Sequence, residues 1–275
     1  MGGLETSTVT VQGKSASFAR GGEGPPVVFL HGWALGHRAY RRSLERLARG
    51  GVSVIAPALP GFGGSAELPA EAFSMAGYAA WVWEFLDAVG VGSDVTLVGH
   101  SFGGGVAIAA AHARPERTRR LVCVNSIGGS AWTEDRGVVR ALRERPLWDW
   151  GLHLQSDVLP WRQLRRVVPV VLEDAVPNLI RSPQVVWKVG QLARRCDLSR
   201  ELDGLRRRGL PVVIVWGKDD EVLPRACLSS LSLALGNPEV VAVDGNHSWL
   251  ISDPRAFTEV ITNVVGLDLP GAESA

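Results

Sequence analysis

The stretch Val95-Thr96-Leu97-Val98-Gly99-His100-Ser101-Phe102-Gly103-Gly104 decides the fold of this chain. An apolar run that predicts a buried strand leads directly into Gly-x-Ser-x-Gly, and a helical segment of small residues, Val106 to Ala113, follows. A strand-to-helix turn this tight forces its serine into a strained backbone conformation and projects the hydroxyl above the sheet. The flanking glycines let neighbouring backbones pass without Cβ clashes. Ser101 is therefore a candidate nucleophile.

Length and composition describe a globular protein. The chain has 275 residues, of which 46% are hydrophobic, and a formal net charge of +1. These values argue against a disordered tail, a coiled coil or a nucleic-acid binder. No basic and apolar leader opens the chain and no run of about 18 apolar residues occurs, so we expect a cytoplasmic protein without a membrane partner. Three widely spaced cysteines, Cys123, Cys196 and Cys227, are expected to be buried and reduced.

Short apolar runs alternate with segments of helical period along most of the chain. Runs that are apolar at nearly every position predict strands covered on both faces, as in parallel sheets. A hairpin around Gly13 precedes them, so the pattern predicts a doubly wound, mostly parallel, eight-stranded α/β sheet. The expected strands are 8–12, 15–19, 27–30, 52–55, 95–98, 121–124, 211–216 and 240–243, and the expected helices are 40–49, 75–89, 106–113, 226–235 and 254–265.

Residues 130–209 interrupt this alternation. They contain no strand-like run, so we expect a helical cap between the sixth and seventh strands, with 1–129 and 210–275 forming the core. Half of the ten tryptophans fall here, Trp132 among them, and they either line a pocket or fill a small helical core. The cap holds 15 Arg and Lys against 10 Asp and Glu, a local excess of +5. This charge could steer an acidic substrate or carrier protein, or be a solvated surface.

A serine hydroxyl needs a base, and the base needs an acid that fixes its tautomer. Of six histidines, His247 lies on the loop after the last apolar run, at the edge where open α/β sheets gather their chemistry. The loop after the seventh strand supplies two adjacent carboxylates, Asp219 and Asp220. The chain order Ser, Asp, His is the one associated with this kind of turn. A bland alternative for His247 is an ordinary hydrogen-bonded loop residue.

Attack on a carbonyl needs two N–H donors for the developing oxyanion. The residue after the nucleophile, Phe102, supplies one donor. His31-Gly32-Trp33 follows the third strand and is placed for the other, with the Trp33 N–H as donor and Gly32 allowing close approach of the main chain. The alternative is that His31 and Gly32 form a plain tight turn.

Together these segments resemble the α/β-hydrolase superfamily over roughly residues 8 to 265. The resemblance implies the fold above, a Ser101, His247, Asp220 triad, and Asp220 in preference to Asp219. It is most similar to small bacterial carboxylesterases, including pimeloyl-carrier-protein methyl ester esterase, and to meta-cleavage-product hydrolases. Two positions depart from these families, Ala58 where Asp is usual and His100 before the nucleophile. The landmarks are His31-Gly32-Trp33, Pro60-Gly61-Phe62-Gly63-Gly64-Ser65, Gly99 to Gly103, Pro115-Glu116-Arg117, Gly217-Lys218-Asp219-Asp220, and His247 with Asp253-Pro254.

We therefore expect a serine hydrolase that cleaves a carboxylic ester of a small to medium apolar acyl compound through an acyl-enzyme. The expected pocket contains Gly32, His100, Trp249 and Trp132. Alternatives are a carbon–carbon bond hydrolase or a cofactor-free perhydrolase with the same triad, and a non-catalytic ligand receptor on this fold. No spacing predicts a metal, nucleotide or other cofactor, and we expect a monomer or homodimer.

Overall fold

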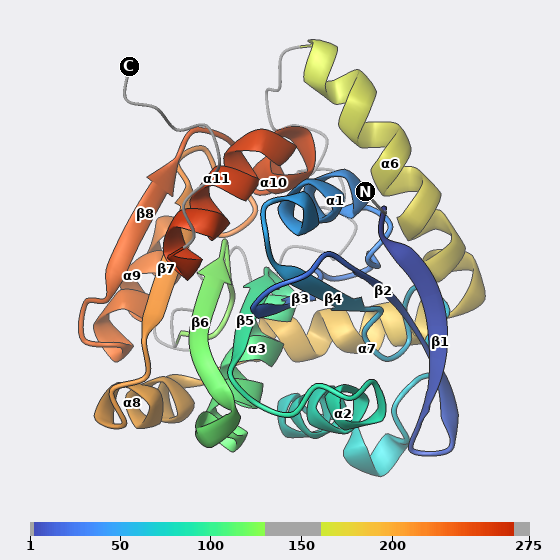
Figure 1. Ribbon diagram of the computed structural model, residues 1–275, viewed down its shortest axis with the longest axis horizontal. Helices are drawn as coiled ribbons and strands as arrows, with labels where there is room; N and C mark the ends of the chain where they lie inside the picture. The colour runs from blue at the N-terminus through green and yellow to red at the C-terminus, as the bar shows by residue number, and fades with distance from the viewer. Residues whose placement is uncertain (1–2, 130–160, 267–275) are drawn as a thin grey trace.

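The computed structural model describes residues 3–129 and 161–266, and its centre is one eight-stranded sheet. The strand order is β1-β2-β4-β3-β5-β6-β7-β8, with β1, β2 and β4 antiparallel neighbours and every other pair parallel. This confirms the predicted doubly wound α/β-hydrolase sheet (Figure 1). The strands are β1 Glu5–Val11, β2 Lys14–Gly21, β3 Pro26–Leu30, β4 Ser53–Pro57, β5 Val95–His100, β6 Thr118–Val124, β7 Val212–Gly217 and β8 Glu239–Val243.

Both faces of the sheet are covered because the parallel strands are apolar on both sides. In β3, Val28 and Leu30 enter one hydrophobic cluster, whereas Val27 and Phe29 enter the other. Helices α2 Met75–Ala88, α3 Phe102–Ala113, α8 Ser199–Arg207 and α9 Arg225–Ala234 contribute buried residues to the first cluster. Helices α1 Arg41–Arg49, α10 Trp249–Ser252 and α11 Pro254–Val265 contribute to the second (Figure 1).

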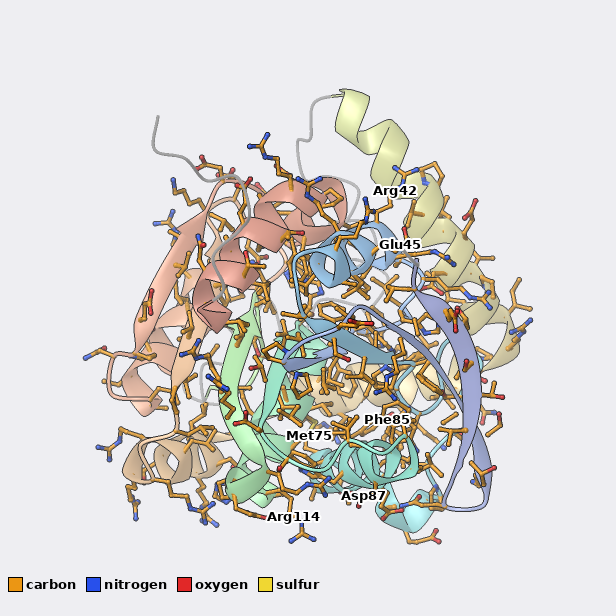
Figure 2. All side chains as sticks on the ribbon, in the orientation of Figure 1. Arg42, Glu45, Met75, Phe85, Asp87 and Arg114 are labelled. Atoms are coloured by element: carbon orange, nitrogen blue, oxygen red, sulfur yellow. The ribbon has the colours of Figure 1, made fainter. Side chains whose placement is uncertain are left out.

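The side chains follow this layering. On α2, Met75 and Phe85 are buried in the core, while Asp87 is exposed. Arg42 on α1 and Arg114 after α3 are likewise exposed at the surface (Figure 2). Cys123, Cys196 and Cys227 are all buried and free. Within 3–129 and 161–266, no helix has both the length and the apolar content needed to cross a membrane.

The part of the 130–209 segment that the structure describes is helical. It contains α6 Trp161–Arg181, α7 Pro183–Arg194 and α8, all between β6 and β7 in the chain. Two buried α6 side chains bind loops of the core. Asp174 Oδ2 accepts hydrogen bonds from the Gly36 and Ala39 N–H groups at 2.7 and 3.1 Å. Asn178 accepts from the Gly63 N–H and donates to the Ala34 carbonyl, both at 2.9 Å.

One helix differs from its predicted bounds in a way that matters for the site. The helix after Ser101 was expected from Val106, but α3 begins at Phe102 and includes Gly103, Gly104 and Gly105. These helical positions are glycines because neighbouring atoms leave no room for a side chain. A Cβ on Gly103 would lie 2.2 Å from the Leu30 carbonyl oxygen.

Candidate active site

Ser101 occupies the turn between β5 and α3. Its φ of 54° and ψ of −118° are a strained combination for a residue other than glycine, as predicted for this turn. The Ser101 N–H donates to the Val124 carbonyl at 3.1 Å, which fixes the turn to the neighbouring strand. Gly99 lets the first turn of α3 pack against the end of β5, since a Cβ on Gly99 would lie 2.4 Å from the Gly103 carbonyl oxygen. Ser101 itself stays partly exposed.

Asp220 and His247 lie together on the loops that follow β7 and β8. The distance from His247 Nδ1 to Asp220 Oδ2 is 2.9 Å, and both side chains are almost fully buried. A carboxylate oxygen only accepts, so Nδ1 carries the proton and Nε2 is left as the acceptor. Asp219, the alternative acid, has an exposed side chain. The structure thus pairs His247 with the carboxylate that the resemblance implied.

Asp220 is held in its ionised form. Burial alone would raise the pKa of its carboxyl, but the His247 imidazole and hydrogen bonds from the Leu223 N–H and Asn125 bring the pKa below its ordinary value. Oδ1 accepts from the Val222 and Leu223 N–H groups, each at 2.9 Å. An anion fixed in this way orients the imidazole and favours its protonated form when it takes a proton.

Sequence reasoning missed Asn125, which supports this acid. Asn125 lies at the end of β6, is fully buried, and donates from Nδ2 to Asp220 Oδ2 at 2.5 Å. Its Oδ1 accepts from Trp249 Nε1 at 2.9 Å and from the Gly217 N–H at 3.3 Å. The usable signal was its place after a strand at the carboxyl edge of the sheet. Trp249, predicted for the pocket, lies instead in the core behind His247, with 1% of its surface exposed.

Ser101 and His247 line the same cavity, of about 40 Å³. Four residues predicted for the site also line it, namely Gly32, Trp33, His100 and Phe102. Within the described ranges no hydrogen bond joins the Ser101 hydroxyl to His247. Trp132 lies outside the described residues. The remaining lining residues are Leu35, Ile127, Ala193, Val222 and Ser248, which are mostly apolar.

The two predicted oxyanion donors come from rigid surroundings. Phe102 is the first residue of α3, where backbone N–H groups have no partner within the helix. The Trp33 loop is fixed to α7, because Trp33 Nε1 donates to the Val186 carbonyl at 2.8 Å.

His31 anchors the loop in which Ala58 replaces the family's usual Asp. Its Nε2 accepts from the Leu59 N–H at 2.8 Å, and Nδ1 donates to the Gly32 carbonyl at 2.9 Å. Burial lowers the pKa of His31 to about 4, so the ring is neutral and can accept.

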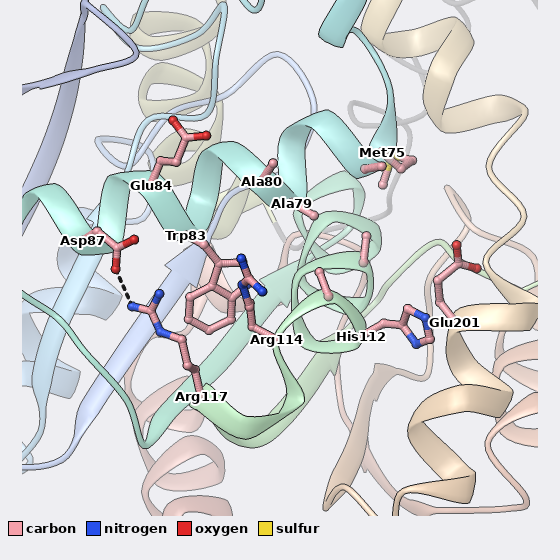
Figure 3. Close-up of a pocket in the computed structure, with 13 residues that line it drawn as sticks. Met75, Ala79, Ala80, Trp83, Glu84, Asp87, His112, Arg114, Arg117 and Glu201 are labelled. Carbon is pink, nitrogen blue, oxygen red and sulfur yellow. Dashed lines mark hydrogen bonds and ion pairs between the residues drawn. The ribbon is translucent and has the colours of Figure 1, made fainter.

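A larger cavity of about 440 Å³ lies between α2, α3 and α8 (Figure 3). Its walls include Trp83, His112 and Glu201, and the Arg117 guanidinium pairs with Asp87 at 2.7 Å. None of the predicted catalytic residues lines it. Across the described chain, no group of three or more His, Cys, Asp or Glu side chains is arranged to hold a metal ion.

The fold and the sequence together define the class of protein. A model of the alpha/beta hydrolase family matches residues 27–260, and the chain belongs to that family. A 2-hydroxymuconate semialdehyde hydrolase from Pseudomonas putida is 40% identical over 262 residues, covering 88% of this chain and 87% of that protein.

Two further likenesses are more distant. A putative non-heme haloperoxidase from Mycobacterium phage D29 is 27% identical over 253 residues, with 87% of each chain covered. The structure of a thermophilic esterase from Thermogutta terrifontis superposes with a TM-score of 0.75 at 21% identity, covering 95% of this chain and 98% of that one. At this identity the structural likeness supports the fold alone.

Proposed function

We propose that this protein is a serine hydrolase that cleaves a carboxylic ester with a small apolar acyl group through an acyl-enzyme. The observation that carries the proposal is the buried Asp220–His247 pair, of which His247 lines the same cavity as the strained Ser101. Strain at a nucleophile, a fixed base and a buried carboxylate form a set that acyl transfer requires.

The mechanism follows from the donors and acceptors. His247 Nε2 takes the Ser101 proton as the hydroxyl oxygen attacks the ester carbon, and the Trp33 and Phe102 N–H groups stabilise the oxyanion. His247 then gives the proton to the leaving alcohol. A water molecule, deprotonated in turn by His247, attacks the acyl-enzyme and releases the acid. These steps use only the chain's own residues and water.

The cavity favours an uncharged, small acyl group. Its described lining is largely apolar and contains no lysine or arginine to bind a substrate carboxylate. The cavity volume of about 40 Å³ is small, which favours a short acyl chain beside Ser101. The cap of residues 130–209, with its excess of basic residues, remains a candidate surface for an acidic carrier protein.

A second candidate is hydrolysis of a carbon–carbon bond by the same triad. It is favoured by the 40% identity to a 2-hydroxymuconate semialdehyde hydrolase. The described lining of the cavity is largely apolar, which favours an uncharged ester over a charged substrate. We therefore place ester hydrolysis first.

A substrate panel with one variant tests the proposal. Purified protein is assayed on p-nitrophenyl acetate, butyrate and decanoate and on a vinylogous diketo acid, alongside Ser101→Ala. We expect the acetate and butyrate esters to be cleaved fastest and Ser101→Ala to lose at least a thousandfold in kcat. Ser252→Ala is the control, since its hydroxyl donates to the Trp249 carbonyl outside the cavity and its loss should leave kcat unchanged. Ester cleavage that survives Ser101→Ala would refute the mechanism, and faster turnover of the diketo acid would favour the second candidate.

A further inference from the structure

Three loops of the site meet at a chain of hydrogen bonds that the mechanism does not use. The Gly32 N–H donates to the Tyr40 hydroxyl oxygen at 3.2 Å. The Tyr40 hydroxyl lies 2.9 Å from His100 Nδ1, and His100 Nε2 lies 2.9 Å from the His247 carbonyl oxygen. Tyr40 and His100 are 1% and 2% exposed, so water cannot replace these contacts.

The two ends of the chain fix the direction of every bond. A backbone N–H only donates and a carbonyl only accepts. His100 Nε2 must therefore carry its proton, and Nδ1 must accept from the Tyr40 hydroxyl. The Tyr40 oxygen in turn accepts from Gly32. The result is one ordered, uncharged path from the oxyanion loop to the backbone of the catalytic base.

The rings and the loop are also in close contact. A Cβ on Gly32 would lie 3.1 Å from both the Tyr40 hydroxyl and His100 Nδ1, so the loop rests directly on the pair. The His100 and His247 rings lie 4.8 Å apart between centroids. Tyr40 and His100 thus contact the Gly32-Trp33 loop, and His100 also contacts the His247 ring.

We infer that Tyr40 and His100 are positioning residues which hold the Gly32-Trp33 oxyanion loop and His247 in one geometry around Ser101. The inference rests on the proposed function. Displacement of a catalytic group by about 1 Å can lower the rate by about a hundredfold, so a buried link between two such groups has a direct effect on kcat. Substrate binding should depend less on Tyr40, because Tyr40 does not line the cavity, whereas His100 does.

The charge state fits this role. Burial lowers the pKa of His100 to about 3, and burial raises the pKa of Tyr40 above its usual range. Both groups are therefore neutral near neutral pH. A neutral His100 does not oppose the positive charge that His247 acquires during the reaction.

Tyr40→Phe provides the sharpest test because the chain contains a matched control. Its only other tyrosine, Tyr78, is also fully buried, and its hydroxyl donates to the Pro60 carbonyl at 3.1 Å. We expect Tyr40→Phe to lower kcat for p-nitrophenyl acetate at least tenfold with KM within about threefold of wild type. Tyr78→Phe should leave kcat within twofold. Fluorophosphonate labelling of wild-type Ser101 is measured first.

A double-mutant cycle separates positioning from packing. The cycle compares the fold-loss in kcat that Tyr40→Phe causes in wild-type protein with the fold-loss it causes in His100→Leu. If Tyr40 acts through His100, the fold-loss in the His100→Leu background should be at least five times smaller. If His100→Leu does not fold, His100→Phe takes its place, because it keeps a planar ring and removes both ring nitrogens.

Each outcome decides between the two claims. Wild-type protein that is labelled at Ser101, with a folded Tyr40→Phe variant within twofold in kcat, overturns the positioning role and leaves the proposed function standing. Independent effects of the two substitutions, or an equal loss in Tyr78→Phe, also overturn it. Wild-type protein that is neither labelled nor active removes the proposed function and this inference with it.

Discussion

Asn125→Asp replaces the NH2 group of one buried side chain with an oxygen and tests how Asp220 is kept ionised. The substitution keeps an oxygen for Trp249 Nε1 and the Gly217 N–H, but it replaces the Nδ2 donor with an oxygen 2.5 Å from Asp220 Oδ2. Two buried carboxylates this close share a proton instead of both ionising. Asp220 then no longer presents a full charge to His247.

The size of the effect follows from Coulomb's law. Two unit charges about 4 Å apart at an effective dielectric constant of about 20 repel by about 4 kcal/mol, or about a thousandfold in proton affinity. Near neutral pH we expect kcat/KM to fall at least tenfold. The loss should shrink as pH rises and the shared proton leaves.

Stability should move in the opposite direction. The folded variant binds a proton that the unfolded chain has already released above about pH 4, so its free energy of unfolding falls relative to wild type as pH rises. The difference should approach about 4 kcal/mol. Urea unfolding and p-nitrophenyl acetate kinetics, each followed from pH 5 to 9, measure both trends.

The control, Asn237→Asp, makes the same Asn-to-Asp change at the protein surface. Asn237 also has a positive φ, 58° against 40° for Asn125, but it is exposed. Asn237→Asp should leave kcat/KM and its pH dependence unchanged. An Asn125→Asp enzyme with the wild-type rate and pH profile would refute the reasoning about Asp220.

Two further predictions concern stability. Asp174→Ala should lower the free energy of unfolding by about 3 kcal/mol, because two buried N–H groups lose their acceptor. Asp174→Asn keeps an acceptor oxygen and should lower it less. Equal losses of the two variants in urea unfolding would contradict this. Burial, the first cause in each case, lowers the pKa of His31 and His37 to about 4 and that of His100 to about 3, so these rings favour the neutral form in the folded state. The stability that these three neutral rings contribute is complete above about pH 6.5 and is lost as pH falls towards their folded-state pKa values. The free energy of unfolding should therefore drop by about 3 kcal/mol between pH 6 and 5. A flat pH dependence in that interval would show that the three rings are not held neutral.

Much of the sheet was predictable because its strands carry local signals. The hairpin is an example, since Gln12 and Gly13 both adopt positive φ, which a tight two-residue turn requires. The buried run of β5 is another, because a strand covered on both faces has apolar residues throughout. The start of α3 was missed because three glycines weaken a helix locally. Tertiary contacts make those glycines necessary, because a Cβ would meet Leu30 at Gly103, Ser126 at Gly104 and Ile127 at Gly105.

The site was predictable only where loop position is tied to a strand end. Ser101, Asp220 and His247 each follow a recognisable strand. Tyr40 and Asp174 gave no such signal, because their roles depend on partners 8 and 138 residues away. Asn125 does follow a strand, but its role depends on Asp220, 95 residues further along the chain. Trp249 was misplaced for the same reason, since an aromatic beside a catalytic histidine can face either the cavity or the core.

The central claim is that Ser101 is a nucleophile activated by His247. Covalent labelling by a fluorophosphonate, followed by peptide mass spectrometry, tests it most directly. We expect one adduct on the peptide containing Ser101, no adduct in Ser101→Ala, and labelling at least a hundredfold slower in His247→Ala. Folded wild-type protein that remains unmodified at Ser101, or is modified equally fast without the His247 imidazole, would contradict the account.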